Sequence, residues 1–498
     1  MISSHLPVLQ VVLPLMAAPL CLLLRRSTPA WGLALAVTWG TLVIAVVLLL
    51  QVLSTGPVSY EIGGWAAPWG IEYRVDMVSA FVLVIVAAVG SLVMPFARLS
   101  VAREVATDRI YLFYTMYLLC LAGLLGITIT GDVFNLFVFL EISSLSSYVL
   151  IGLGGDRRAL TAAFRYLVMG TIGATFYIIG VGMMYMMTGT LNMADLSTLI
   201  PAVADTRTIQ VALAFLTVGL SLKLALFPLH LWLPNAYTYA PSAVTAFLAG
   251  TATKVAVYAL IRIFFTVFGG VDVFEIFFTR EVLMGLALAA MFTASAVAIF
   301  QTNIKRMLAY SSVAQIGYMI LGISFATVTG LTGGIVHLFN HALMKGVLFM
   351  AMGCVFWQLG SVHIRDLAGL GRRMPVTMAA FVVGGLSLIG VPLTVGFISK
   401  WMLIQAAFEK GWWPIAVLVL ISSLLAVIYI WRIVEVAYFR PVACQPGAKS
   451  ASKITEAPLS MLLPMWVLTG ACLYFGINAT HTLEIARVAA AMLLGTTP

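Results

Sequence analysis

The chain alternates along its whole length between long apolar segments and short polar ones. An apolar run of about 20 residues is what a helix needs to cross a bilayer. Fourteen such runs, here called spans 1 to 14, fall at residues 6–24, 31–53, 76–97, 110–128, 132–152, 161–187, 208–229, 241–264, 282–300, 306–324, 330–358, 376–400, 412–437 and 459–479. The pattern predicts an all-α integral membrane protein with about fourteen transmembrane helices.

Composition supports this fold class. The 498 residues are 62% hydrophobic and only 9% charged, and the mean hydropathy is +1.08. Soluble domains carry far more charge than this. The first span has no basic segment before it and is followed by Arg25 and Arg26, which predicts a retained first helix and not a signal peptide.

Lys and Arg residues gather in alternate loops. The loops after spans 1, 3, 5, 9, 11 and 13 hold 17 of the 27, namely Arg25, Arg26, Arg98, Arg103, Arg109, Arg157, Arg158, Arg165, Lys305, Arg306, Arg365, Arg372, Arg373, Arg432, Arg440, Lys449 and Lys453. The other side holds about six: Arg74, Arg207, Arg262, Arg280, Lys410 and Arg487. The positive-inside rule then predicts cytoplasmic basic loops and both termini outside. The expected location is the cell inner (plasma) membrane. Because topology explains most of the net charge of +9, nucleic acid is not an expected partner.

Two further patterns bear on function. Five cysteines are scattered without a C-x-x-C pair, at Cys21, Cys120, Cys354, Cys444 and Cys472. We therefore expect no metal site, iron–sulfur cluster or disulfide framework. Residues 54–75 are rich in Gly, Pro and Trp, which predicts an ordered external hairpin.

Four basic residues remain inside predicted spans: Lys223, Lys254, Lys345 and Lys400. A charge at the bilayer centre costs roughly 2.5–3.5 kcal/mol on insertion scales, so these lysines are candidates for an ion path. Glu141 lies near the middle of span 5, at a depth similar to that of Lys223 in span 7. Because neither charge is stable alone in hydrocarbon, we predict that the two pair. A static pair that only fixes packing is the alternative.

Asp132, at the start of span 5, is expected to be an exposed helix-capping residue. Lys254 follows the small residues of Gly250–Thr253 in span 8, which permit close approach of another helix. It lies too deep in its span to reach water easily by snorkelling. A buried lysine at this depth is a candidate relay station for protons.

Span 11 places three ionisable groups on one helical stripe. His337, His341 and Lys345 are spaced i, i+4 and i+8, with Asn340 beside them. Imidazoles titrate near neutral pH, so the stripe is a candidate proton wire. Chelation of zinc by the two histidines is the competing interpretation, but no Glu stands between them as in a zinc protease.

Two spans are interrupted. Lys223 precedes Pro228 and Pro234 in span 7, whereas Gly390 and Pro392 precede Lys400 in span 12. Breaks at membrane depth survive only where protein or internal water satisfies the freed backbone groups. Spans 4–8 and 9–13 each number five, and an odd number reverses the second copy in the membrane. The sequence therefore predicts two inverted five-helix repeats with broken helices 7 and 12.

The expected parts of the chain follow from this arithmetic. Residues 1–109 form the first three helices and the external hairpin, and residues 110–264 form the first proton-translocating repeat. Residues 282–437 form the second, inverted repeat, and residues 438–498 form a cytoplasmic loop, helix 14 and a C-terminal tail.

Four runs carry a resemblance to a known family: GDVFNLFVFLEISSLSSY (131–148), LKLALFPLHLWLPNAYTYAPSAVTAFLAGTATK (222–254), HLFNHALMKGVLF (337–349) and GVPLTVGFISKW (390–401). They resemble the proton-translocating, antiporter-like subunits of respiratory complex I, membrane-bound hydrogenases and Mrp-type cation/proton antiporters. The resemblance implies the same helical fold with inverted repeats. It also implies a chain of buried ionisable groups at the membrane midplane, formed by Glu141, Lys223, Lys254, His341, Lys345 and Lys400.

Within the family, GDVFNLFVFLE and the later TGTLNMADLS (188–197) favour the D-type subunits of Mrp antiporters. Lys400 disfavours the complex I subunit that has a glutamate at this position. The function implied is exchange of cytoplasmic Na⁺ or K⁺ for external H⁺, in a complex with other membrane subunits in the lipid bilayer. A proton-pumping subunit of a complex I-like enzyme or a hydrogenase is the alternative.

In both cases the chain itself is not expected to be an enzyme. It has no Rossmann GxGxxG, no flavin site and no cluster-binding cysteines, so no cofactor is expected. A purely structural scaffold is disfavoured because it would have no use for four lysines and a glutamate at depth.

Overall fold

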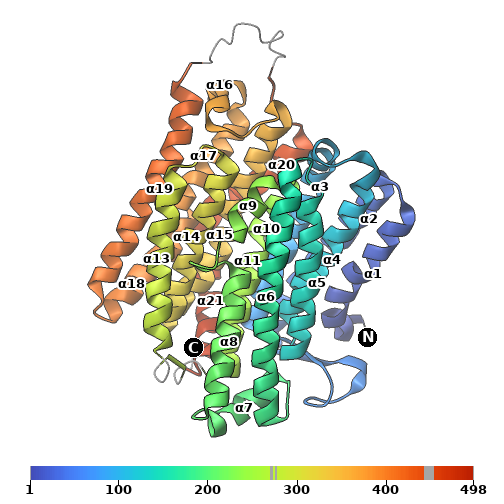
Figure 1. The fold of residues 1–498 in the computed structure, drawn as a ribbon, viewed down its shortest axis with the longest axis vertical. Coiled ribbons are helices and arrows are strands. Elements are labelled where there is room, and N and C mark those ends of the chain that lie inside the picture. The colour runs from blue at the N-terminus through green and yellow to red at the C-terminus, as the bar shows by residue number, and fades with distance from the viewer. Residues whose placement is uncertain (1, 270–272, 275–277, 442–453, 497–498) are drawn as a thin grey trace.

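The computed structural model describes residues 2–269, 273–274, 278–441 and 454–496, and Cys444, Lys449 and Lys453 lie outside these ranges. The chain is a bundle of long helices packed side by side (Figure 1). Within the described ranges, thirteen helices are long and apolar enough to cross a membrane. The remaining predicted span, span 12, is present as two shorter helices, so the predicted multi-pass membrane fold is confirmed.

The first half of the bundle corresponds to spans 1 to 8. Its helices are α1 (Leu6–Leu24), α2 (Ser27–Thr55), α3 (Met77–Glu104), α4 (Ile110–Ile129), α5 (Val133–Gly152), α6 (Arg157–Thr188), α7 (Met193–Val203), α8 (Arg207–Leu224), α9 (Trp232–Tyr239), α10 (Ser242–Gly250) and α11 (Ala252–Ile261). A π-helical turn, η4 (Arg262–Val267), continues α11, and short 3-10 turns lie at η1 (Ile2–His5), η2 (Ile62–Gly64) and η3 (Thr107–Arg109).

The second half corresponds to spans 9 to 14. Its helices are α13 (Thr279–Ile299), α14 (Ile304–Ser324), α15 (Val328–Leu359), α16 (Leu370–Arg373), α17 (Pro375–Ile389), α18 (Val395–Glu409), α19 (Trp413–Phe439), α20 (Leu459–Ile477) and α21 (Thr480–Leu493), with a 3-10 turn at η5 (Ile364–Leu367). Helices α7 and α21 are short additions to the predicted set.

The segment before α3 forms the predicted hairpin. Strands β1 (Val58–Glu61) and β2 (Glu72–Val75) pair antiparallel, with Val58 opposite Val75. Asp76 follows β2 and begins α3 with a reciprocal capping box, in which Asp76 and Ser79 each bond the backbone N–H of the other. The hairpin and α3 are thereby joined without a flexible linker.

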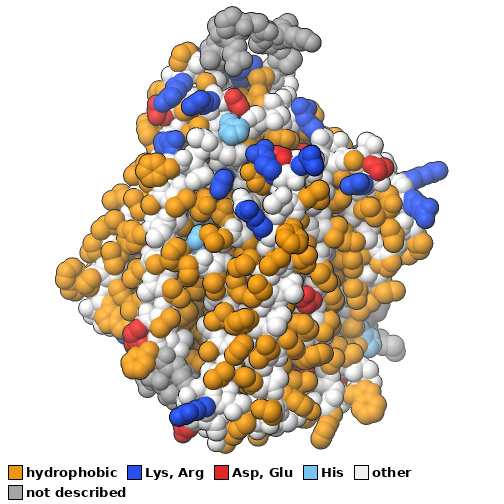
Figure 2. All heavy atoms as spheres, in the orientation of Figure 1, with side chains coloured by type: hydrophobic (Ala, Val, Ile, Leu, Met, Phe, Trp, Pro, Cys, Tyr) orange, Lys and Arg blue, Asp and Glu red, His pale blue; other side chains and the backbone are white. Residues whose placement is uncertain are grey.

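Charge is distributed unevenly over the surface. Figure 2 shows Lys and Arg side chains gathered over one end of the bundle, above a broad belt of hydrophobic side chains. We call this the basic end. Both termini lie toward the other end (Figure 1). The gathering of basic side chains at one end and the hydrophobic belt thus agree with a membrane-spanning bundle. The cytoplasmic location of the basic end stays a prediction.

The two predicted helix breaks are present. Helix α8 ends at Leu224, where Ala225 adopts a left-handed conformation with φ 61°. The indole N–H of Trp232 then donates to the freed Leu222 carbonyl at 2.9 Å. In span 12, α17 ends before Gly390 with φ 92°, and α18 begins at Val395. Each break therefore ends a helix without leaving all of its carbonyls unpaired.

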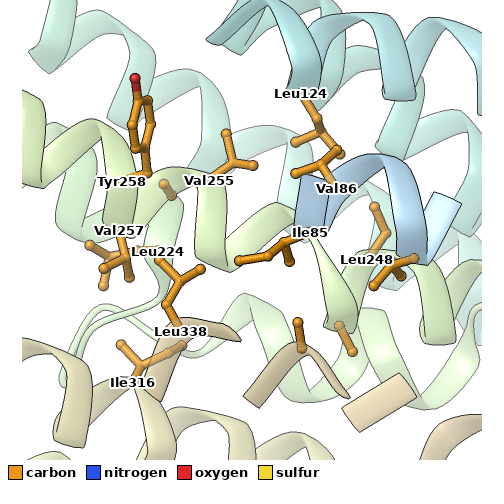
Figure 3. Close-up of a cluster of buried hydrophobic side chains, with 14 of the residues drawn as sticks. Ile85, Val86, Leu124, Leu224, Leu248, Val255, Val257, Tyr258, Ile316 and Leu338 are labelled. Atoms are coloured by element: carbon orange, nitrogen blue, oxygen red, sulfur yellow. The ribbon is translucent and has the colours of Figure 1, made fainter. Parts of the chain in front are cut away.

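A third break lies in span 8, which the sequence predicts to be continuous. Thr251 leaves helical geometry, with φ −126° and ψ −61°, and separates α10 from α11. No proline or left-handed glycine marks the place. Span 8, as α10, α11 and η4, is almost entirely buried in the centre of the bundle. In Figure 3 its residues Leu248, Val255, Val257 and Tyr258 lie among side chains of α3, α4, α8, α14 and α15.

Two basic residues assigned to loops are in fact buried. Lys305 is 3% exposed and lies 3.8 Å from Glu104, and Arg262 is 6% exposed and lies 2.5 Å from Asp76. The loop assignment was wrong because each lies at a helix end that other elements cover.

Asp132 was also only partly predicted. Its carboxylate caps α5 by accepting from the Asn135 N–H at 2.6 Å, as expected. It is buried and not exposed, however, being only 8% accessible. A backbone bridge to Asn192 brings the segment before α7 across it. The local sequence of a helix-capping residue is the same whether or not other segments cover it, so the burial of Asp132 could not be predicted from the sequence.

The crossing of α6 and α8 gives a test of this packing. A Cβ at Gly219 would lie 2.7 Å from the Gly173 carbonyl oxygen and 2.8 Å from the Tyr177 nitrogen, whereas a Cβ at Gly182 on α6 meets nothing within 4 Å. We expect Gly219→Ala to destabilise the fold by about 1–3 kcal/mol through overpacking, and Gly182→Ala to be near neutral. Thermal unfolding of the purified variants in detergent measures the difference; equal melting temperatures would contradict the crossing.

Candidate functional site

The predicted pair of Glu141 and Lys223 is present. The Lys223 ammonium lies 3.1 Å from a Glu141 oxygen and donates to the Ser144 hydroxyl at 2.8 Å. The lysine side chain is 4% exposed and the glutamate side chain 25%. The two oxygen partners offset part of the free energy that burying an isolated ammonium in a membrane would cost.

Local structure explains how the pair is held. Glu141 and Ser144 are one helical turn apart on α5, so both face α8. Lys223 is in the last turn of α8, where the negative end of the helix dipole favours a cation. The indole of Trp232 stacks on Tyr166 at a centroid distance of 3.8 Å and covers this helix end. The break in span 7 therefore places the lysine.

A small cavity of about 20 Å³ lies beside Lys223. Its lining includes Ser143, Ser144 and Ser147 on α5 and Ala252 and Val255 on α11. This volume is enough for about one water molecule, and the serines supply polar partners for it. The cavity therefore extends from the first pair toward the helix that carries Lys254.

Lys254 is completely buried and lies at the unpredicted break of span 8. Its ammonium donates to the Ala249 carbonyl, in the last turn of α10, and to the Thr253 hydroxyl at 3.3 Å. The break frees a carbonyl that would otherwise bond within a continuous helix. As predicted, the side chain does not reach the surface.

The stripe on α15 is also present and buried. The rings of His337 and His341 are nearly parallel, with centroids 6.3 Å apart and an interplanar angle of 5°. His337 Nδ1 lies 2.8 Å from the Ser399 hydroxyl of α18, and the Asn340 amide donates to the same hydroxyl at 3.1 Å and to the Val395 carbonyl at 2.6 Å. The first part of the stripe is therefore tied to the second half of span 12.

His341 and Lys345 continue the stripe toward α14. The Lys345 ammonium donates to the Leu308 carbonyl at 2.8 Å and to the Ser311 hydroxyl. Neither ring nitrogen of His341 has a hydrogen-bond partner among the described residues. A bridging water is the partner that a buried imidazole of this kind needs.

Lys400 ends the series. Its ammonium donates to the Leu388 and Ile389 carbonyls at 3.0 and 2.8 Å, which are the last carbonyls of α17. It also lies over the Tyr318 ring, 4.9 Å from the centroid. The Tyr318 ring is 5.4 Å from that of His337. The broken helix thus supplies oxygen acceptors for the lysine on its other half, and an aromatic side chain lies between it and the stripe.

The predicted ionisable residues therefore form a series on α5, α8, α11, α15 and α18, and all of them are buried except Glu141, whose side chain is 25% exposed. Sequence reasoning missed the groups that hold them: Ser144, Ser311, Tyr318 and Ser399. In the sequence these four residues are marked only by a hydroxyl group within an apolar span. Such residues are common in membrane helices, so they could not be singled out. Among the described residues, no group of three or more His, Cys, Asp and Glu could hold a metal ion.

The chain is similar to known membrane proteins along most of its length. Residues 130–426 match the family described as NADH:quinone oxidoreductase/Mrp antiporter, transmembrane. The chain is 44% identical over 481 residues to the N-type subunit of NADH-quinone oxidoreductase from Desulforudis audaxviator, covering 94% of each chain. It is 33% identical to the D-type subunit of the Na⁺/H⁺ antiporter from Alkalihalophilus pseudofirmus, over 80% of each. A chain of the Mrp complex from a Dietzia species has the same fold, with TM-score 0.90 and 27% identity over 99% of this chain and 98% of that one.

Gly390 gives a test of how Lys400 is held. Its φ of +92° is strained for other residues, and a Cβ there would lie 3.0 Å from Cδ of Lys400; Gly411 has a similar φ of +71° but open space around it. We expect Gly411→Ala to cost of order 1–3 kcal/mol from backbone strain alone, and Gly390→Ala to cost more.

In a Lys400→Ala background the excess cost of Gly390→Ala over Gly411→Ala should vanish, since the contact is gone. Thermal unfolding of the single and double variants measures this coupling. An excess cost that persists without the Lys400 side chain would show that the glycine serves the backbone only.

Proposed function

This chain belongs to the NADH:quinone oxidoreductase/Mrp antiporter transmembrane family, and from that premise we propose that it is the proton-translocating subunit of a multi-subunit cation/proton antiporter. It exchanges cytoplasmic Na⁺ or K⁺ for external H⁺. Its partners are the other membrane subunits of the complex, with the basic end of the bundle in the cytoplasm and both termini outside. The similarity to a D-type antiporter subunit and to the Mrp complex structure supports this assignment.

The observation that carries the proposal is the buried series itself. Each lysine meets an oxygen acceptor from a neighbouring helix or from a broken helix end: Glu141 for Lys223, the Ala249 carbonyl for Lys254, the Leu308 carbonyl for Lys345, and the Leu388 and Ile389 carbonyls for Lys400. A structural scaffold gains nothing from fully buried ammonium groups, whereas a proton carrier needs groups that bind and release protons.

In the proposed mechanism a proton enters near the Glu141–Lys223 pair and leaves near Lys400. A neutral lysine accepts the proton from its neighbour through water or an imidazole, and the donor lysine becomes neutral in turn. His341 receives a proton on one ring nitrogen and gives one up from the other, so its charge is restored after each transfer. The groups titrate as a coupled set because each charge changes the energy of the next.

The chain itself acts as a transporter subunit and not as an enzyme in this proposal. Residues 110–264 form the first proton-translocating repeat and residues 282–437 the second, inverted one. Residues 1–109 frame the first repeat, and residues 438–498 close the second. The broken fourth span of each five-helix set, α8 with α9 and α17 with α18, supports this division.

A second assignment is favoured by one specific comparison. The 44% identity to an N-type subunit of NADH-quinone oxidoreductase exceeds the 33% identity to the D-type antiporter subunit. In this alternative the same series carries protons in a redox-driven complex, and the oxidation chemistry takes place in other subunits. The two assignments share the path and differ in what drives it.

The first test uses everted vesicles that contain the whole complex. We expect Na⁺ or K⁺ addition to dissipate a proton gradient with the wild-type chain. Lys223→Ala and Glu141→Ala should each reduce this exchange by about ten-fold or more, since removing one partner leaves the other charge uncompensated. Lys410→Ala, an exposed lysine outside the series, is the matched control and should retain full exchange. Fluorescence quenching of a pH-sensitive dye measures the rates.

Two outcomes of this experiment would contradict the proposal. Full exchange in both the Lys223 and Glu141 variants would remove the pair from the path. A wild-type complex that ignores Na⁺ and K⁺ but acidifies the vesicle lumen when a reductant is supplied would replace the antiporter assignment with the redox-driven one.

A further test concerns the Ser144 hydroxyl, which accepts a hydrogen bond from the Lys223 ammonium alongside Glu141. Ser144→Ala removes an acceptor of the ammonium, whereas Ser146→Ala removes a hydroxyl that donates only to the Ile142 and Ser143 carbonyls of its own helix. We expect Ser144→Ala to slow exchange by about ten-fold or more, because a hydrogen bond to a charged group is worth about 1.5–3 kcal/mol, and Ser146→Ala to leave it near wild type. Equal rates in the same vesicle assay would exclude Ser144 from holding the lysine.

A further inference from the structure

Span 8 has a cleft and a buried ion pair at each of its two ends, and Lys254 lies between them. The span consists of α10, α11 and η4, and the series described above does not use its end groups. Both acidic partners come from the two ends of a single helix, α3. This arrangement is not explained by the charge series alone.

The cleft at the basic end has a volume of about 320 Å³, and Glu104 and Lys305 are part of its lining. The Glu104 carboxylate lies 3.8 Å from the Lys305 ammonium, and their side chains are 9% and 4% exposed. The same carboxylate accepts from the N–H and hydroxyl of Ser242, at 2.9 and 3.0 Å, and from Ser100 at 2.7 Å. Lys305 also donates to the Ala240 carbonyl at 3.3 Å. The pair therefore holds the beginning of α10 at the base of the cleft.

The cleft at the other end has a volume of about 550 Å³, and Asp76 and Arg262 are part of its lining. The Arg262 guanidinium donates to Asp76 at 2.5 Å, and their side chains are 8% and 20% exposed respectively. Its Nε–H donates to the Tyr258 hydroxyl at 2.8 Å, which in turn donates to the Thr128 carbonyl at 2.8 Å. This second pair holds η4, the last part of the span, at the base of the second cleft.

Helix α3 connects the two pairs. Asp76 caps its first turn and Glu104 is its last residue. In between, α3 contacts the break region directly, since a Cβ on Gly250 would lie 2.7 Å from Val89. One continuous helix therefore contacts both ends of a broken one, and the break at Thr251 divides span 8 into two helical halves.

We propose that the two ion pairs are the access gates of Lys254: Glu104–Lys305 closes it from the basic end, and Asp76–Arg262 closes it from the opposite end. This inference rests on the proposed function and names the residues that control access to it. With both pairs formed, Lys254 is 0% exposed. Separation of one pair frees one half of span 8 from α3 and admits water to Lys254 from that cleft alone.

Each cleft also carries other charges that face its pair. Arg103, Asp156, Arg158 and His363 line the cleft at the basic end, and Glu72 and Arg74 line the other. Each pair thus shares its cleft with groups of both signs.

The test measures access to Lys254 directly and needs no transport. Thr253 is 1% exposed, and its hydroxyl accepts from Lys254. Thr253→Cys, in a background whose five native cysteines are replaced, places a thiol beside the lysine. A membrane-impermeant methanethiosulfonate that bears a sulfonate is applied to everted and to right-side-out vesicles containing the assembled complex. Mass spectrometry measures the rate of labelling from each face.

We expect slow labelling from both faces with both pairs intact. Lys305→Gln should speed labelling by about ten-fold or more from one face only, and Arg262→Gln from the other face only, because each breaks one buried pair. Both changes leave the carboxylates in place to cap α10 and α3. Lys305→Arg and Arg262→Lys keep the charge and should restore slow labelling. Arg440→Gln, which breaks the exposed pair with Glu435, is the control and should change nothing.

The proposal is overturned if both Gln variants speed labelling from the same face, if neither does, or if Arg440→Gln has an equal effect. Should a single variant fail to assemble, Glu104→Gln with Lys305→Gln removes both charges and leaves none uncompensated, and the same one-sided labelling is expected. Side-specific labelling in a complex without Na⁺ or K⁺ exchange would keep the gates and discard the antiporter assignment.

Discussion

The structure depends on one constraint: an ammonium group inside a bilayer must meet oxygen atoms that the protein itself provides. An α-helix uses most of its carbonyls internally, so its free acceptors lie mainly at its ends. Lys345 is the exception, because it shares the Leu308 carbonyl within α14. Lys254 and Lys400 both bind carbonyls that belong to a helix end in the middle of the membrane. Lys223, by contrast, has a carboxylate and a hydroxyl from α5. The helix breaks in spans 8 and 12 therefore supply the carbonyl acceptors that stabilise the buried ammonium groups of Lys254 and Lys400.

The position of span 8 follows from this constraint. It is the span whose break gives Lys254 its acceptor, and it lies in the centre of the bundle with apolar side chains of both halves around it (Figure 3). Its two ends cannot rest on lipid, because they carry Arg262 and the N–H groups at the start of α10 that have no partner within that helix. Helix α3 meets both needs with Asp76 and Glu104. A helix outside the predicted repeats thus holds the centre of the first one.

The geometry also explains why one fold serves both antiporters and redox-driven pumps. The proposed path from Glu141 to Lys400 is compatible with either driving force, and the chain is similar to members of both kinds of complex. Coupling to a cation or to a redox reaction requires that the two ends of the path never open together. That requirement falls on the access to each lysine and not on the lysines, and the proposed gates at the ends of span 8 would meet it.

The sequence alone determined the apolar spans, the two proline- or glycine-marked breaks and the pairing of Glu141 with Lys223. It did so because a bilayer admits few backbone structures. The free energy of burying a single charge in a bilayer is also high enough to predict that two buried charges of opposite sign pair, as Glu141 and Lys223 do. Only the tertiary structure decided the break at Thr251, which no proline or left-handed glycine marks and at which Lys254 binds the Ala249 carbonyl. It also decided the burial of Lys305 and Arg262. Whether a residue at a helix end is exposed to water depends on which distant segments of the chain pack over it, and the local sequence does not determine which segments those are.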